Sequence, residues 1–324
     1  MKQQQFEQLR SDSWLHFEQQ LEQLEKGDKH KRPAEDFPQR YRALCQDKAL
    51  AQSRAYSNTL VERLQQLVSR GHQQLYRHRS RSLSRIVQFL LADLPRAVRR
   101  EWRAVGIASA CFYGPALLLG VLVYLFPELI YNLMDPAQVR DMEQMYDPSA
   151  RRFGEGALRS SDSNWVMFGH YISNNIGIGF RTYATGIIFG LGSLFLVVFN
   201  GLVIGGVAGY LSQLGFVETF FGFVIAHGAF ELTAITFAGA AGLKLGWSLI
   251  APGNLSRLQA LQQAARDSMT LVYGVILLLL IAAFVEAFWS SMNLAFSTKL
   301  IVGTLMWLWV AAYFGWMGRS HAAE

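Results

Sequence analysis

Long apolar stretches separated by short polar ones fill the chain from residue 104 onward. A helix needs about 20 apolar residues to cross the hydrocarbon core of a bilayer. The first stretch, AVGIASACFYGPALLLGVLVYLF, carries no charge over that length. The five stretches cover residues 104–126, 182–214, 216–249, 268–292 and 300–317. This pattern predicts an all-α fold, a polytopic α-helical membrane protein with about five transmembrane segments.

The first 100 residues follow a different pattern and are predicted to form a helical domain. Trp14, Phe17 and Leu21 recur at helical spacing. A second apolar stripe runs through residues 39–76, and no glycine or proline interrupts this segment before Gly71. We expect two or three helices that pack against each other or against a second copy, which is the form of an interaction module. The domain lacks a glycine-rich phosphate loop, so an ATPase role has no residues to support it.

Charge changes this picture by giving the chain an orientation. The segment from Arg70 to Arg103 carries nine arginines against two acids, directly before the first apolar stretch. Under the positive-inside rule this bias places the N-terminal domain in the cytoplasm and the protein in the cytoplasmic (inner) membrane. The arginines nearest that stretch are expected to meet anionic lipid headgroups: Arg77, Arg79, Arg81, Arg85, Arg96, Arg99, Arg100 and Arg103.

Apolar residues among these arginines predict a helix that lies in the headgroup layer; they are Ile86, Phe89, Leu90 and Leu94. Nucleic-acid binding is not predicted, because proximity to the membrane already explains the arginines. The expected domains are therefore residues 1–100, cytoplasmic and helical with this basic interfacial helix, and residues 101–324, a transmembrane bundle. The bundle is expected to include an extracytoplasmic segment at about 127–181, with a short amphipathic helix in AQVRDMEQMY.

Several polar residues lie inside or beside the apolar stretches, where hydrocarbon does not tolerate them unpaired. The expected buried cluster consists of Asn175, Asn200, His227, Glu231 and Glu286. His227 and Glu231 are four residues apart and share one face of a helix. Glu286 from a later stretch can join them and place one imidazole between two carboxylates. Glycines at three- and four-residue intervals in the second and third stretches indicate close helix packing around them.

Four interpretations of this cluster stay open. It is foremost a hydrogen-bonded lock that fixes helix register. Next comes a proton or ion relay, since ionisable groups lie among glycine-rich helices. An enzyme is less favoured, because no serine, cysteine or HExxH system accompanies the histidine. A metal site is favoured least, since zinc usually takes more nitrogen or sulfur ligands, and no metal or cofactor is predicted.

The chain resembles the stage II sporulation protein M family of bacterial membrane proteins. The resemblance rests on NNIGIGFRTYATGIIFGLGS, FNGLVIGG, HGAFELTAITFAGAAGLKLG, APGNLSRLQAL and IAAFVEAFW, which occur in this order. It implies a membrane scaffold, since members in spore formers position proteins that hydrolyse peptidoglycan. The long N-terminal domain resembles members encoded beside MoxR-type AAA+ ATPases and von Willebrand factor A domain proteins, which it suggests as partners. It assigns no catalytic residue, and His170 is not expected from the family's pattern.

Charge also leaves two alternatives for the path of the chain. If all five stretches cross, Arg257, Arg266 and Arg319 lie outside, against the positive-inside rule. If the third stretch instead enters and returns near AHGAF, these arginines lie inside and His227 lies at a buried hairpin tip.

The sequence favours a scaffold or assembly protein for cell-envelope processes, which recruits partners through its N-terminal domain and acts as a homodimer. The alternative is a transporter or channel that uses the His/Glu cluster for ion or proton movement.

Overall fold

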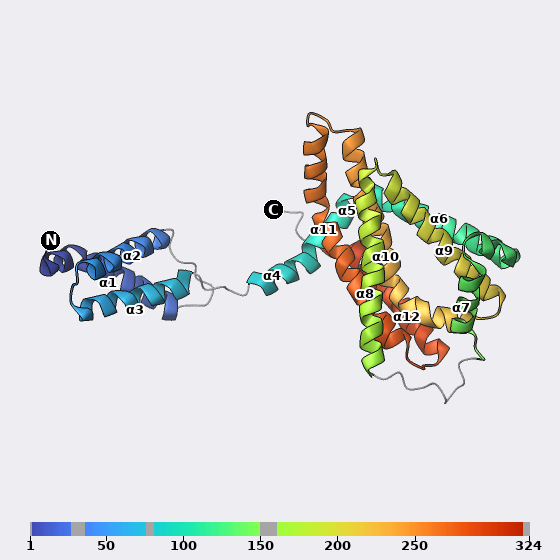
Figure 1. Cartoon of the computed structure of the whole chain (residues 1–324), viewed down its shortest axis with the longest axis horizontal. Helices are drawn as coiled ribbons and strands as arrows, with labels where there is room; N and C mark the ends of the chain where they lie inside the picture. The colour runs from blue at the N-terminus through green and yellow to red at the C-terminus, as the bar shows by residue number, and fades with distance from the viewer. Residues whose placement is uncertain (1, 27–35, 76–80, 150–160, 320–324) are drawn as a thin grey trace. The chain divides into compact units, whose positions relative to one another are not determined.

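The computed structural model describes residues 2–26, 36–75, 81–149 and 161–319 (Figure 1). Every regular element in these ranges is a helix, as the sequence predicted. The chain divides into two compact units, residues 1–85 and 86–324. We call them the head and the body.

The head contains the helices α1 (Gln3–Lys26), α2 (Phe37–Ser53) and α3 (Asn58–Leu75). They enclose a hydrophobic core of their own, in which Phe17, Leu21 and Leu64 are completely or almost completely buried. Trp14 is also buried, and its Nε1 donates a 2.9 Å hydrogen bond to Asp47 Oδ2. A polar indole nitrogen in a core needs such a partner.

The apolar stripe through residues 39–76 is interrupted, and the expectation of one uninterrupted segment was wrong. The chain turns between α2 and α3, where Ala55 takes a φ of 50°. The Tyr56 N–H donates back to the Ala51 carbonyl at 3.0 Å, and Tyr56 packs against the core. The turn lets α2 and α3 bury their apolar faces against each other, which one straight helix cannot do.

The juxtamembrane segment is helical but is not simply a headgroup-layer helix. It consists of α4 (Arg81–Gln88), the π-helix η1 (Phe89–Asp93) and α5 (Leu94–Arg100). Ile86 is 54% exposed, whereas Leu94 is 1% exposed and lies against Gly274. Tyr313 near the end of the chain donates a hydrogen bond to the Leu90 carbonyl. The C-terminal half of this segment is therefore part of the core of the body.

The rest of the body is built from long helices joined by short ones. In chain order they are α6 (Trp102–Leu125), η2 (Pro127–Asn132), α7 (Pro136–Tyr146), α8 (Ser161–Ala184), η3 (Thr185–Ile187), α9 (Leu191–Gln213), α10 (Val217–Ile250), α11 (Arg257–Phe284), η4 (Val285–Ser290) and α12 (Phe296–Trp316). Five of the described helices are long and apolar enough to cross a membrane, namely α6, α9, α10, α11 with η4, and α12. They match the five apolar stretches, and α7 matches the expected amphipathic helix.

Glycines bring α6 and α9 into close contact, and these two helices run in the same direction. Gly201, Gly205 and Gly209 of α9 lie against the carbonyls of Phe112, Ala116 and Gly120 of α6, respectively. A side chain at any of these three glycines would meet backbone atoms of α6. The small residues that predicted tight packing in the sequence thus lie at a close contact between two helices of the body.

Two parallel neighbours need a connecting segment that returns along the body, and α8 is that segment. Its first turns lie beside η4, where the ring centroids of Trp165 and Phe288 are 5.1 Å apart. Its last turn lies beside the start of α9, where Ser193 Oγ donates to the Thr182 carbonyl. Helix α8 therefore returns from the η4 end of the body to the start of α9, and Figure 1 shows it crossing α6 and α9 at a steep angle.

This path removes the conflict between the five stretches and the charge rule. Because α8 returns, the loop after α10 and the end of α12 lie at the same end of the body as α5. Arg96 Nε donates to the Gly318 carbonyl at 3.2 Å, and an Arg100 guanidinium nitrogen donates to the Asp267 carbonyl at 3.1 Å. Part of the segment 127–181, which the sequence predicts to be extracytoplasmic, forms α8 and packs against α10 and α11.

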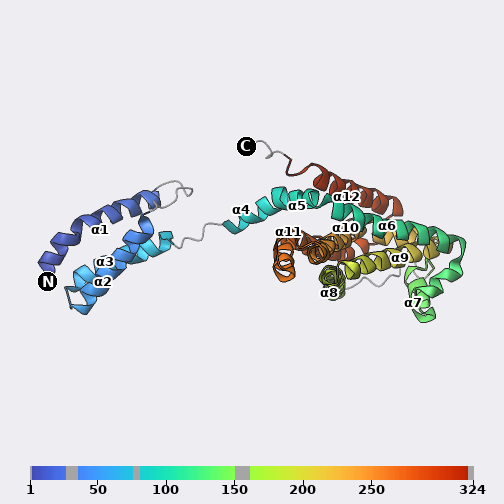
Figure 2. The same cartoon turned by 90° about the horizontal axis from the view of Figure 1, so that it is seen from above.

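Helix α10 is the centre of the body and is continuous. It spans 34 residues, and α6, α8, α9, α11 and α12 all pack against it (Figures 1 and 2). The alternative in which this stretch enters and returns near AHGAF was wrong, since residues 225–235 are helical throughout. His227 therefore lies within a buried helix and not at a hairpin tip.

Candidate functional site

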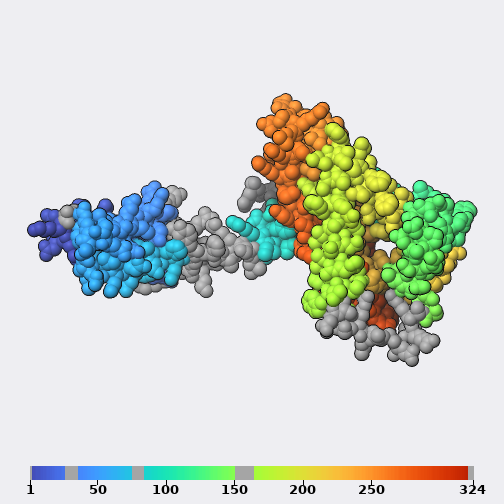
Figure 3. Space-filling model, viewed as in Figure 1, coloured from blue at the N-terminus to red at the C-terminus, as the bar shows by residue number. Residues whose placement is uncertain are grey.

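A polar cavity of about 330 Å³ lies in the body between α7, α8, α9, α10 and η4. The surface is hollowed between α8 and the neighbouring green part of the chain (Figure 3). Side chains that can donate or accept hydrogen bonds line it together with apolar ones, and the polar ones are Tyr146, His170, Tyr171, Asn174, Asn175, His227, Glu231 and Glu286. Such a cavity could not be read from the sequence, because its walls come from segments far apart in the chain.

Three ionisable groups converge on one point of the cavity wall. His227 and Glu231 lie on successive turns of α10, and Glu286 reaches them from η4. One nitrogen of the imidazole and one oxygen of each carboxylate all lie within 4.8 Å of one another. We call these three residues the HEE cluster. The helical spacing of His227 and Glu231 was visible in the sequence, whereas the position of Glu286 depended on how α11 packs.

The imidazole of His227 is held on one side only. Its Nδ1 shares a 3.0 Å hydrogen bond with Ser290 Oγ, and its ring packs edge-on to Phe223. Its Nε2 faces Glu231 Oε2 at 4.0 Å, which is too long for a hydrogen bond. The His227 side chain is 6% exposed and that of Glu231 is 18% exposed. The cluster therefore contains a gap between an imidazole nitrogen and a carboxylate oxygen, both of which can bind a metal.

The π-helix η4 places two residues of the site. A π-turn widens the helix by one residue per hydrogen-bonded ring, and such turns occur frequently at functional sites. Here the turn carries both Glu286 and Ser290. The Ser290 carbonyl also accepts a 2.9 Å hydrogen bond from Lys299 Nζ, and Lys299 is only 6% exposed. Sequence analysis missed Ser290 and Lys299; the signal available for Lys299 was a lone lysine beside an apolar stretch.

The two predicted asparagines have different environments. Asn175 is 3% exposed and lines the cavity, and among the described residues its Nδ2 has no hydrogen-bond partner. Its Oδ1 accepts a 3.1 Å hydrogen bond from Asn174 Nδ2. Asn200 is not brought into the cluster: it is absent from the cavity wall, and its Nδ2 donates to the Leu196 carbonyl of its own helix.

The predicted membrane-surface arginines fall into three groups. Arg77 and Arg79 lie outside the described residues, and of Arg81 only the helical backbone is described. Arg85 and Arg103 are exposed. Arg96, Arg99 and Arg100 instead donate to backbone carbonyls in the C-terminal part of the body. At least these three arginines therefore hold α5 on the bundle in addition to facing its surface.

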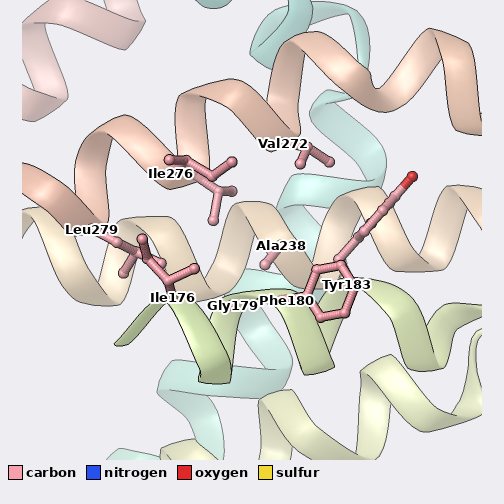
Figure 4. A pocket seen from close by; sticks show the side chains of 9 residues that line it. Ile176, Gly179, Phe180, Tyr183, Ala238, Val272, Ile276 and Leu279 are labelled. Carbon is pink, nitrogen blue, oxygen red and sulfur yellow. The ribbon is translucent and has the colours of Figure 1, made fainter. Parts of the chain in front are cut away.

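A second, smaller cavity lies between α8, α10 and α11 and is apolar. Its volume is about 50 Å³, and Figure 4 shows aliphatic side chains from α8 and α11 around it. Tyr183 also lines this cavity, and its hydroxyl is hydrogen bonded to Ser268. The chemistry of the body is therefore concentrated in the polar cavity.

Comparison with known proteins agrees with this architecture. The family model for Stage II sporulation protein M matches residues 107–291, which is more than half of the chain and contains the whole HEE cluster. The chain belongs to the stage II sporulation protein M family. Residues 4–77, a range that includes most of the head helices, match a second family model described as a domain of unknown function (DUF8413).

The chain is also similar to the uncharacterized protein MJ0793 of Methanocaldococcus jannaschii. It is 27% identical over 123 residues, which are 37% of this chain and 69% of the relative. No solved structure matches the chain significantly.

Proposed function

We propose that the protein is a membrane-embedded scaffold that recruits partner proteins through its head for cell-envelope processes. The observation that carries this proposal is the separate fold of the head. Its core is closed by its own three helices, and residues 1–85 form one compact unit. A domain that does not need the body for its core is free to evolve a binding surface. On α1, Leu9 and Leu15 are 69% and 54% exposed, which suits an apolar contact with a partner.

The proposed orientation puts the head in the cytoplasm and the protein in the cytoplasmic membrane. Basic side chains gather at the end of the body that carries α5, where Lys244 pairs with Glu101 at 2.5 Å and Arg96 and Arg100 bind the C-terminal part of the chain. The opposite end contains residues 127–149, with five acids and one arginine. Lys and Arg accumulate on the cytoplasmic side of membrane proteins.

The proposed partners are a second copy of the chain and the MoxR-type AAA+ ATPases or von Willebrand factor A domain proteins that the family resemblance suggests. The test is cross-linking and affinity capture of the full chain from its native membrane, followed by mass spectrometry. Deletion of residues 1–80 is expected to abolish capture, and L9D is expected to weaken it. The matched control is E231Q, which alters the cavity and is expected to capture the same partners. Equal capture by the deleted and full chains would refute recruitment by the head.

A second candidate function is movement of protons or ions through the body, and the polar cavity favours it. Ionisable groups within a membrane-spanning body usually mark a pathway or a relay. The test is flux into proteoliposomes that contain the purified protein and a pH-sensitive dye. For a relay, E231Q and E286Q would each stop flux while deletion of residues 1–80 leaves it unchanged. Absence of flux with the full chain would exclude this candidate.

A further inference from the structure

The HEE cluster has the donor atoms of a metal site. We propose that His227, Glu231 and Glu286 together bind one divalent transition-metal ion, for which Zn²⁺ serves as the test probe. One imidazole nitrogen and two carboxylate oxygens lie within 4.8 Å of one another. Nitrogen and oxygen ligands together suit zinc and its neighbours in the periodic table, whereas Mg²⁺ and Ca²⁺ prefer oxygen alone.

The three ligand atoms must move closer together to bind one ion, from separations of up to 4.8 Å. Zinc binds imidazole nitrogen and carboxylate oxygen at about 2.0–2.2 Å, so two ligand atoms of a tetrahedral ion lie about 3.4 Å apart. His227 Nε2 and Glu231 Oε2 are separated by 4.0 Å, with no hydrogen bond between them. Rotation of the glutamate side chains can close the difference without movement of α10. An ion between the two atoms would fill the gap that they leave.

The second nitrogen of His227 is held as in known metal sites. A histidine that binds a metal usually donates its other ring N–H to a fixed acceptor, which sets the tautomer and aims the ring. Ser290 Oγ occupies this position at 3.0 Å from Nδ1. With the proton on Nδ1, the lone pair of Nε2 points toward the glutamates. A lone pair facing carboxylates is unfavourable unless a cation or a proton lies between them.

Charge balance points in the same direction. Two carboxylates within a membrane-spanning body need positive charge nearby, because water is scarce there. Lys299 supplies one positive charge on the far side of Ser290, whose carbonyl it contacts at 2.9 Å. A divalent ion would compensate both carboxylates directly and leave the imidazole neutral. A structural lock made only of protein groups would instead need protons on the glutamates.

The remaining coordination positions face polar groups and open space. Asn175 is only 3% exposed and lines the same cavity. Within the described residues, its Nδ2 has no hydrogen-bond partner. The cavity of about 330 Å³ has room for several waters, each of which occupies about 30 Å³ in the liquid. The site can therefore hold zinc by three side chains and keep a position open toward the cavity.

The test uses the full chain purified in detergent, stripped with EDTA and dialysed against ZnCl₂, with zinc measured by mass spectrometry. One Zn²⁺ per chain is expected, and CaCl₂ or MgCl₂ at the same concentration is expected not to displace it. E231Q and E286Q keep the shape of the side chain but are poor ligands, so each is expected to weaken zinc binding at least tenfold. S290A removes the outer partner of His227 and is expected to weaken binding about 10–100-fold.

The matched control is E218Q, which changes an exposed glutamate on the same helix and is expected to bind zinc within twofold of the unaltered chain. Thermal unfolding of every variant checks that it is folded, and zinc is expected to raise the Tm of the unaltered chain but not that of E286Q. Absence of saturable zinc uptake by the folded, unaltered chain would overturn the proposal in favour of a protonated lock. Undiminished zinc uptake by E231Q and E286Q would overturn the proposal, because the zinc would then be bound elsewhere, for example by surface histidines. Partner capture by the head does not depend on either outcome.

Discussion

Substitution of Gly205 by alanine tests the packing of α6 against α9, on which the path of the chain through the body depends. A Cβ at position 205 would lie against the carbonyl oxygen of Ala116, far inside the usual contact distance. Backbone atoms cannot rotate away, so the two helices must move apart. Overpacking of this kind costs about 1–3 kcal/mol. Alanine also favours the helix over glycine by about 1 kcal/mol, which works in the opposite direction.

A control at Gly106 of α6 removes the ambiguity. A Cβ there meets no atom within 4 Å, so G106A gains the same helix propensity without a clash. The difference in unfolding free energy between the two variants therefore isolates the packing cost, and we expect G205A to be about 1–3 kcal/mol less stable than G106A. G120A should fall between them, because its Cβ would lie 3.1 Å from the Gly205 carbonyl oxygen.

The assay is reversible unfolding of the purified protein in mixed micelles, followed by circular dichroism. Equal stability of G205A and G106A would refute the close parallel contact. The return of α8 along the body would then lose its support.

Three further predictions concern the topology and the head. In a cysteine-free background, N254C should react with a membrane-impermeant thiol reagent only from the side of the membrane that carries the head. A cysteine placed in α7 should react only from the opposite side of the membrane. Reaction of both cysteines from the same side would contradict the return through α8. W14F should lower the stability of the head by about 1–3 kcal/mol in chemical denaturation, because it leaves Asp47 without the 2.9 Å hydrogen bond from the indole; an unchanged midpoint would show that this bond contributes nothing. The hydrogen bond from Arg40 holds the pKa of Asp36 below its ordinary value. The stabilisation of the folded head by this pair is therefore present above about pH 4 and is lost as the pH falls through the pKa of Asp36 in the folded protein. R40Q should raise the pKa of Asp36 in a carboxyl NMR titration, and an unmoved titration would exclude the pair as the cause.

Residue patterns along the chain were sufficient to locate the membrane-length helices and one shared helix face. Apolar length alone located the five helices that can cross a membrane, and α7 was visible as an amphipathic segment. Helical spacing alone put His227 and Glu231 on one face of α10. These features follow from the period of the helix and the cost of polar groups in hydrocarbon, and both act within a single segment.

Features that depend on pairs of distant segments were not predictable in the same way. Helix α8 was assigned to the outside because its polar residues lower its hydropathy, yet residues such as Asn175 face a cavity and not lipid. Asn200 and Lys299 are both polar residues beside apolar stretches, but only Lys299 reaches the residues around His227. Which of them does so depends on the rotation of α9 and α12 about their axes, and packing sets that rotation.

The sequence by itself therefore determined the class of the protein, its spans and its family, because each is written in local composition and order. Only the tertiary structure decided the direction of α9, the return of α8 and the meeting of Glu286 with His227 and Glu231. The physical reason is that both features join segments that are far apart in the chain but adjacent in space. One is the set of glycine contacts between α6 and α9, and the other is the π-turn that positions Glu286.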